Sequence, residues 1–149
     1  MTGRILASIL VFAIVFRQGL TFGIEPGDDE RTKDLRELKG AWSVASIDIA
    51  GGHTHDVLRM SIVIHDDKLS IRACPTLSGE ITALWDATKS PKQVDFADQI
   101  DGKPSVHRAL YRLDGDKLTL AVGPRDGARP TEFKAEKATV LIVLARAKR

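Results

Sequence analysis

Apolar and polar residues alternate along several short segments of the chain, as in a β-strand that buries one of its two faces. The alternation runs over residues 58–65 and again over residues 69–74, and Asp66 and Asp67 separate the two segments. Aspartate is common in tight turns because its side chain bonds to the nearby backbone. The pattern therefore predicts an antiparallel hairpin.

A second hairpin is expected where residues 108–113 and 118–122 flank Gly115, because glycine tolerates the left-handed conformation of a tight turn. Four more segments have strand-like composition: residues 42–49, 81–85, 93–96 and 140–145. The last of them is apolar on both faces, so we expect the N-terminal helix or a partner to cover it. About eight strands, spaced roughly ten residues apart without a long helix, predict an all-β antiparallel sandwich or barrel.

A short helix is expected before the first strand. Asp28 and Asp29 supply the acidic first turn, residues 25–27 read as a linker, and Gly40 suits the position after a helix end. Leu35 and Leu38 lie three residues apart and form one apolar edge. Two interpretations are open: the helix plugs one end of the sheet structure, or it is a solvated leader.

The N-terminal segment is typical of a secretory signal peptide. Arg4 precedes an apolar run at residues 5–16, and small residues follow near position 23. We therefore expect a signal peptide at 1–23, a linker and helix start at 24–34, a β-barrel domain at 35–149, and a secreted or periplasmic protein. The alternative is an uncleaved N-terminal membrane anchor, although the run is shorter than the roughly 20 residues that span a bilayer.

The net charge argues against a nucleic-acid partner, and the cysteine count excludes an internal disulfide. The chain has 22 basic and 20 acidic residues, and the expected signal peptide holds Arg4 and Arg17 but no acid, so the mature chain is formally neutral. A neutral protein with mixed charges has no electrostatic surface for a phosphate backbone, so nucleic acid is not expected as a partner. The single cysteine, Cys74, cannot form an internal disulfide. Oligomeric state is left open.

Four short motifs resemble a family of uncharacterised secreted domains that is abundant in planctomycete genomes. They are residues 38–44 (LKGAWSV), 88–95 (TKSPKQVD), 113–118 (LDGDKL) and 129–133 (RPTEF), and they occur in the family's order. The family is lipocalin-like, and Gly40 to Trp42 is similar to the Gly-X-Trp that starts the first lipocalin strand. The resemblance implies a lipocalin-like up-and-down barrel of about eight strands and export, and it implies no activity.

The same resemblance implies roles for particular residues. Gly40 and Trp42 are expected at the closed end of the barrel, with Arg146 of the last strand over the indole ring. From its residue types, and independently of the resemblance, the segment around Pro130 is expected to act as a latch that holds the last strand, or else to recognise a ligand or partner. Its members are Arg129, Pro130, Glu132 and Phe133.

No group of residues reads as a catalytic centre, and no cofactor is expected. His53 and His55 are metal-ligand types on one face of an extended segment, yet a third ligand is not evident, so we expect no metal site. The primary hypothesis is a secreted binding module for a small, largely apolar molecule. The alternative is an envelope structural or protein-interaction domain whose barrel is filled. The expected ligand-lining residues are Met60, Ile62, Ile71, Trp85, Tyr111 and Leu120.

Overall fold

One helix and nine strands follow one another along the part of the chain that the computed structural model describes, namely residues 26–50, 52–54, 59–74 and 77–148. The helix is α2 (Pro26–Leu38). The strands are β1 (Gly40–Ile49), β2 (Gly52–Thr54), β3 (Ser61–His65), β4 (Lys68–Cys74), β5 (Leu77–Asp86), β6 (Gln93–Ile100), β7 (Lys103–Asp114), β8 (Lys117–Arg125) and β9 (Val140–Arg146).

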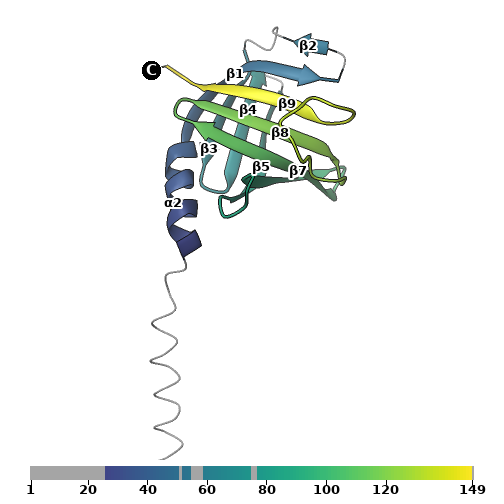
Figure 1. Cartoon of the computed structure of the whole chain (residues 1–149). Coiled ribbons are helices and arrows are strands. Elements are labelled where there is room, and N and C mark those ends of the chain that lie inside the picture. The colour runs from purple at the N-terminus through teal and green to yellow at the C-terminus, as the bar shows by residue number, and fades with distance from the viewer. Residues whose placement is uncertain (1–25, 51, 55–58, 75–76, 149) are drawn as a thin grey trace, which may run out of the picture.

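Eight of these strands close into a barrel (Figure 1). Neighbours in sequence pair antiparallel from β3 to β9, and β1 pairs with both β3 and β9, so the sheet closes on itself. The short β2 pairs only with β1, outside this ring. The all-β, up-and-down barrel with a short N-terminal helix, expected from the alternation and the resemblance, is therefore confirmed.

Both expected hairpins are present. In the β3–β4 hairpin, His65 pairs with Lys68 and Asp66 adopts a positive φ of 54°. In the β7–β8 hairpin, Asp114 pairs with Lys117 and Gly115 has a φ of 59°. Left-handed residues at these positions match the right-handed twist of the paired strands, so tight turns form there.

Several elements extend beyond their expected limits. Helix α2 begins at Pro26, so Pro26 and Gly27 belong to its first turn and not to a linker. Proline suits a first turn because it lacks only an N–H that would have no partner there. Strands β5, β6 and β7 continue past the apolar alternation, because ladder hydrogen bonds join backbone groups whatever the side chains are.

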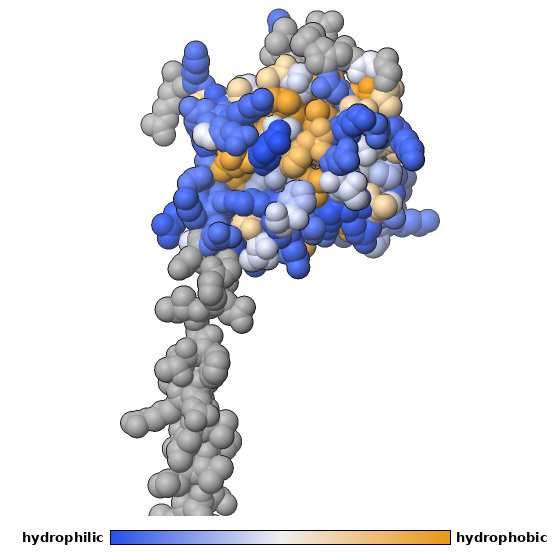
Figure 2. All heavy atoms as spheres, in the orientation of Figure 1, coloured by the Kyte–Doolittle hydropathy of each residue, from blue (hydrophilic) through white to orange (hydrophobic). Residues whose placement is uncertain are grey.

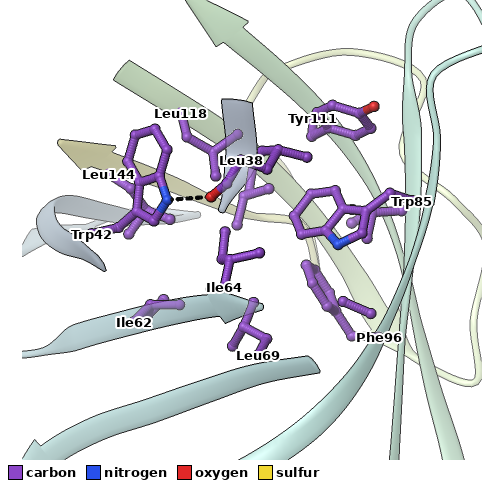
Figure 3. Close-up of a cluster of buried hydrophobic side chains, with 14 of the residues drawn as sticks. Leu38, Trp42, Ile62, Ile64, Leu69, Trp85, Phe96, Tyr111, Leu118 and Leu144 are labelled. Atoms are coloured by element: carbon purple, nitrogen blue, oxygen red, sulfur yellow. Dashed lines mark hydrogen bonds between the residues drawn. The ribbon is translucent and has the colours of Figure 1, made fainter. Parts of the chain in front are cut away.

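The barrel interior is packed with apolar side chains. Inward positions alternate along each strand, as Leu118 and Leu120 do on either side of the outward Thr119. Most of the large inward side chains pack in one cluster around Trp42, Trp85 and Tyr111 (Figure 3). The other members of this cluster are Leu38, Val44, Ile62, Ile64, Leu69, Ala83, Val94, Phe96, Ala109, Leu118, Leu120 and Leu144.

Helix α2 lies at one end of the barrel (Figure 1). Leu38 is fully buried in the interior cluster and Leu35 packs against it, so the plug interpretation holds. The turns β3–β4 and β7–β8 and the 87–92 loop lie at this end, which we call the closed end. The opposite end, where β1 joins β2 and β8 connects to β9, we call the open end.

The outer face of β9 is not covered by α2, contrary to one expectation. Leu141 and Val143 point outward between β1 and β8 and are half-buried. Figure 2 shows apolar side chains gathered among polar ones on the face that includes β9. No helix of the described residues is both long and apolar enough to cross a membrane.

Some expectations concern residues outside the described ranges. These are the signal peptide at 1–23, the linker residues up to 25, and His55.

Replacing Leu118 by alanine should lower the free energy of unfolding by about 2–4 kcal/mol, because the fully buried side chain leaves a cavity in the cluster. Leu84→Ala is the matched control: Leu84 is 52% exposed on β5, and its loss should cost less than about 0.5 kcal/mol. Urea unfolding followed by tryptophan fluorescence measures both. Equal effects would contradict the inward assignment of Leu118.

Candidate functional site

The closed end is built around Trp42. Its indole Nε1 donates a hydrogen bond of 2.8 Å to the carbonyl oxygen of Leu38, and the ring is fully buried (Figure 3). The guanidinium of Arg146 lies 4.2 Å from the ring centroid, as the resemblance implies. Gly40 has a φ of 125°, and a β-carbon there would lie 3.5 Å from Arg146 Nη1. This conformation disfavours any other residue at position 40.

Arg146 also joins the last strand to the helix. Its Nη2 donates to the carbonyl of Glu37 at 2.6 Å and its Nη1 to the carbonyl of Lys39 at 3.3 Å. These carbonyls lie at the C-terminal end of α2, where they lack helical partners and where a positive charge is favoured. Nε of Arg146 bonds to Asp116 at 3.0 Å. One side chain therefore fixes the helix, the first strand and the last strand together.

A buried carboxylate forms the second link between helix and barrel. Asp34 of α2 accepts a hydrogen bond of 2.7 Å from the hydroxyl of Tyr111 and bonds of 2.8 and 2.9 Å from Nζ of Lys92. Asp34 is only 6% exposed, and a buried charge is unfavourable unless it has partners. Tyr111 and Lys92 are those partners. Burial, together with the neighbouring carboxylate, raises the pKa of Tyr111 well above its ordinary value. These three groups are structural, because their polar atoms satisfy one another.

The segment 129–133 lies on the outer wall of the barrel, within the long connection from β8 to β9. Arg129 Nη2 bonds to Asp95 at 2.7 Å, and Nη1 donates to the carbonyls of Ala109 and Val94 at 2.7 and 3.3 Å. The Phe133 ring lies 4.7 Å below the guanidinium carbon of Arg112.

The contacts of this segment hold it against the barrel wall at β6 and β7, whereas the expected latch would hold the last strand. A β-carbon at position 123 would lie 2.6 Å from the carbonyl oxygen of Ala128 and 2.9 Å from that of Arg108, so glycine is needed there for the connection to lie against β8. Glu132 is exposed. Arg129 therefore ties the connection to β6 and β7, and Phe133 ties it to β7.

All six expected ligand-lining residues belong to the interior cluster or pack against it. Trp85 and Tyr111 meet edge to face with ring centroids 5.0 Å apart, and Phe96 meets Trp85 in the same way at 6.1 Å. These rings, with Leu120 and Ile62, are buried and fill the middle of the barrel. The main role of these four expected lining residues is therefore to pack the core: Trp85, Tyr111, Leu120 and Ile62. A ligand could contact only the part of their surface that faces the open end.

Nearer the open end, the inward side chains are only half-buried. A side chain on the inner wall of a closed barrel meets solvent chiefly through the barrel's end, so this part of the wall is in contact with solvent. We call this region the open half. Its apolar wall consists of Ile47, Met60, Ile71, Ile81, Val122 and Ile142.

The sequence reasoning missed polar groups on the inner wall. Asp98 and Ser105 face each other across the β6–β7 ladder, and His107 faces Phe96, which lies in the interior cluster. Side chains two residues apart share a face, so all three lie on the inner wall. His107 Nδ1 lies 3.0 Å from the carbonyl of Gly123. Extending the alternation of residues 108–113 backward along the chain would have found two of these polar residues, Ser105 and His107.

Two hollows lie outside the barrel. One of about 470 Å³ lies within the β8–β9 connection, and one of about 410 Å³ lies between α2, the 87–92 loop and Phe133. The basic groups beside the second hollow include Lys92 and Arg112, which already pair with Asp34 and Asp114. Both hollows are open to solvent and do not include the expected lining residues, apart from Tyr111 at the edge of the second.

His53 and His55, the two metal-ligand types named from the sequence, are not brought together among the described residues. His53 lies in β2, and its expected companion His55 lies outside the described ranges. Within those ranges, no group of three or more His, Cys, Asp or Glu residues could hold a metal ion.

Arg146→Lys should lower the free energy of unfolding by about 1–2 kcal/mol, because lysine keeps the charge but cannot reach Trp42, two carbonyls and Asp116 together. Arg36→Lys is the control, since Arg36 is exposed in the last turn of the same helix and should change stability by less than about 0.5 kcal/mol. Urea titration measures the difference. A loss no larger than the control's would remove Arg146 from this role.

Tyr111 is the only tyrosine, so tyrosinate absorbance reports on it alone. We expect no tyrosinate in the folded protein at pH about 10, where a free tyrosine is half ionised. Because the folded chain keeps a proton that the unfolded chain releases, stability should fall as pH rises above that value. A titration midpoint near 10 with an intact circular dichroism spectrum would contradict the buried hydrogen bond to Asp34.

Comparison with described protein families, with curated proteins and with solved structures finds no match to this chain. The resemblance to the planctomycete family therefore stays a prediction.

Proposed function

We propose that the protein is a secreted binding module for a small, largely apolar molecule, which it holds in the open half of the barrel. The observation that supports this is the partly buried apolar wall described above, since inward isoleucines that solvent can reach are unfavourable unless something covers them. Ligand sites are typically concave and apolar, with a few placed polar groups, and Asp98, Ser105 and His107 supply such groups here.

The two ends of the barrel support the proposal in different ways. The closed end is sealed by α2, Trp42 and the Asp34 network, so a ligand has one direction of entry. Burying the roughly 100 Å² of apolar surface that a few such side chains expose would contribute about 2–3 kcal/mol to binding. Export, expected from the N-terminal segment, would place the site in contact with molecules outside the cytoplasm.

The filled-barrel alternative rests on the outer face of β9. Leu141 and Val143 could contact an envelope protein there, in which case the interior would bind nothing. The two functions make opposite demands on the open half, because added volume is tolerated in an accessible space and destabilises a filled one.

Ile71→Trp separates the two. If the open half is accessible, the variant should keep its free energy of unfolding within about 1 kcal/mol and lose binding of the neutral probe N-phenyl-1-naphthylamine. Fluorescence titration measures the binding, and urea unfolding measures the stability.

Leu84→Trp is the control for the Ile71 variant, since it adds a comparable ring at an outward, exposed position and should leave probe binding unchanged. If the unaltered protein binds no probe and Ile71→Trp costs about 1–3 kcal/mol, the barrel is filled and the binding proposal is wrong.

A further inference from the structure

The indole N–H of Trp85 has no hydrogen-bond partner. The residue is 3% exposed, and its Nε1 is fully buried with no acceptor in reach among the described residues. The other tryptophan differs, since Trp42 donates to the carbonyl of Leu38. Buried indole nitrogens in proteins usually find an acceptor, because leaving one unpaired costs free energy.

The ring of Trp85 packs between two other aromatic rings. Tyr111 and Phe96 meet it edge to face at interplanar angles of 89° and 90°. In Figure 3 the nitrogen lies on the edge of the indole that faces Phe96 and is turned away from Tyr111. Tyr111 is bonded to Asp34 at the closed end, so the free N–H is directed away from that end.

The inner wall beside Trp85 carries small side chains. Val94 pairs with Trp85 on one side and with Ala109 on the other, and Ala83 is the next inward residue of β5. Beyond Ala83 the wall continues with Ile81 of the open half. Phe96 pairs with Ala83 on this side, so a ligand in the open half approaches the N–H along Ala83 and beside the Phe96 ring.

The charges nearby determine what kind of acceptor fits. An indole N–H only donates, so the ligand atom must be an acceptor. The basic side chains around this part of the barrel already have acidic partners: Lys92 pairs with Asp34, and Arg129 pairs with Asp95 on the outer wall. A carboxylate at Trp85 would be buried without a counter-charge, which is far less favourable than a neutral oxygen.

We propose that the ligand carries a neutral carbonyl-type oxygen that accepts a hydrogen bond from Trp85 Nε1, with its apolar remainder extending toward the open end. This inference rests on the proposed function, because it names the chemistry of a ligand in the same site.

The test compares 2-octanone with 2-methyl-1-octene, in which a methylene group replaces the carbonyl oxygen at nearly the same shape. Binding of each is measured by displacement of N-phenyl-1-naphthylamine from the unaltered protein, from Trp85→Phe and from Thr119→Val. The ratio of the two affinities should favour the ketone about tenfold more in the unaltered protein than in Trp85→Phe.

Thr119→Val is the matched control. Its hydroxyl is also buried without a partner, but it points outward from β8, so its removal should leave the ratio unchanged.

A second measurement needs no variant to fold. The two tryptophans give two indole signals in a ¹⁵N-labelled sample, and the ketone alone should move the Trp85 proton downfield. If both probes bind without that shift and with the same ratio in every variant, a water or nothing occupies the N–H and this inference is wrong, while the proposed function stands. If neither probe binds, the proposed function is overturned, and this inference with it.

Discussion

The pairing of β1 with β9 is the constraint on which the rest of the structure depends. It joins the first and last strands of the ring across nearly the whole sequence of the domain, and it removes the exposed edges that an open sheet would present. The ladder includes one bulge between Val44 and Ser46, which bends β1 where the barrel closes. Inside and outside faces exist only because this pairing forms.

Closure of the sheet does not by itself hold the helix against the barrel. Two further links, both at the closed end, do so. Arg146 lies at the end of β9 and reaches the last carbonyls of α2 and the ring of Trp42. Asp34 reaches from the same helix to Tyr111 and Lys92. Both links join residues that are far apart in sequence, so they stabilise the folded state specifically and cannot form in the helix by itself.

The difference between the two ends then determines where binding is possible. The aromatic side chains and the helix occupy the closed half, so the proposed ligand enters at the open half, where the inward isoleucines are only partly buried. The inner wall also changes character along β6 and β7, from Val94 and Ala109 to Asp98 and Ser105. Two kinds of polar group therefore face the interior: the N–H of Trp85 among the apolar side chains, and Asp98 with Ser105 farther from the closed end.

Much of this architecture follows from the sequence alone. Alternation at period two depends only on which residues avoid water, and it predicted both hairpins and the inward position of the six proposed lining residues. The short β2, at Gly52–Thr54, was not predicted. Turn chemistry at Asp66 and Gly115 is equally local. The limits of β5 to β7 could not be predicted in this way, because backbone pairing continues beyond the apolar pattern.

The tertiary structure decided which polar residues face the interior and which are satisfied. Asp34 reads as an ordinary acid on a polar helix, and only the docking of that helix buries it beside Tyr111. Trp85 and Trp42 have the same side chain, yet one indole finds a carbonyl and the other finds none. Hydrogen-bond satisfaction depends on atoms brought together by closure of the barrel, so no local pattern encodes it.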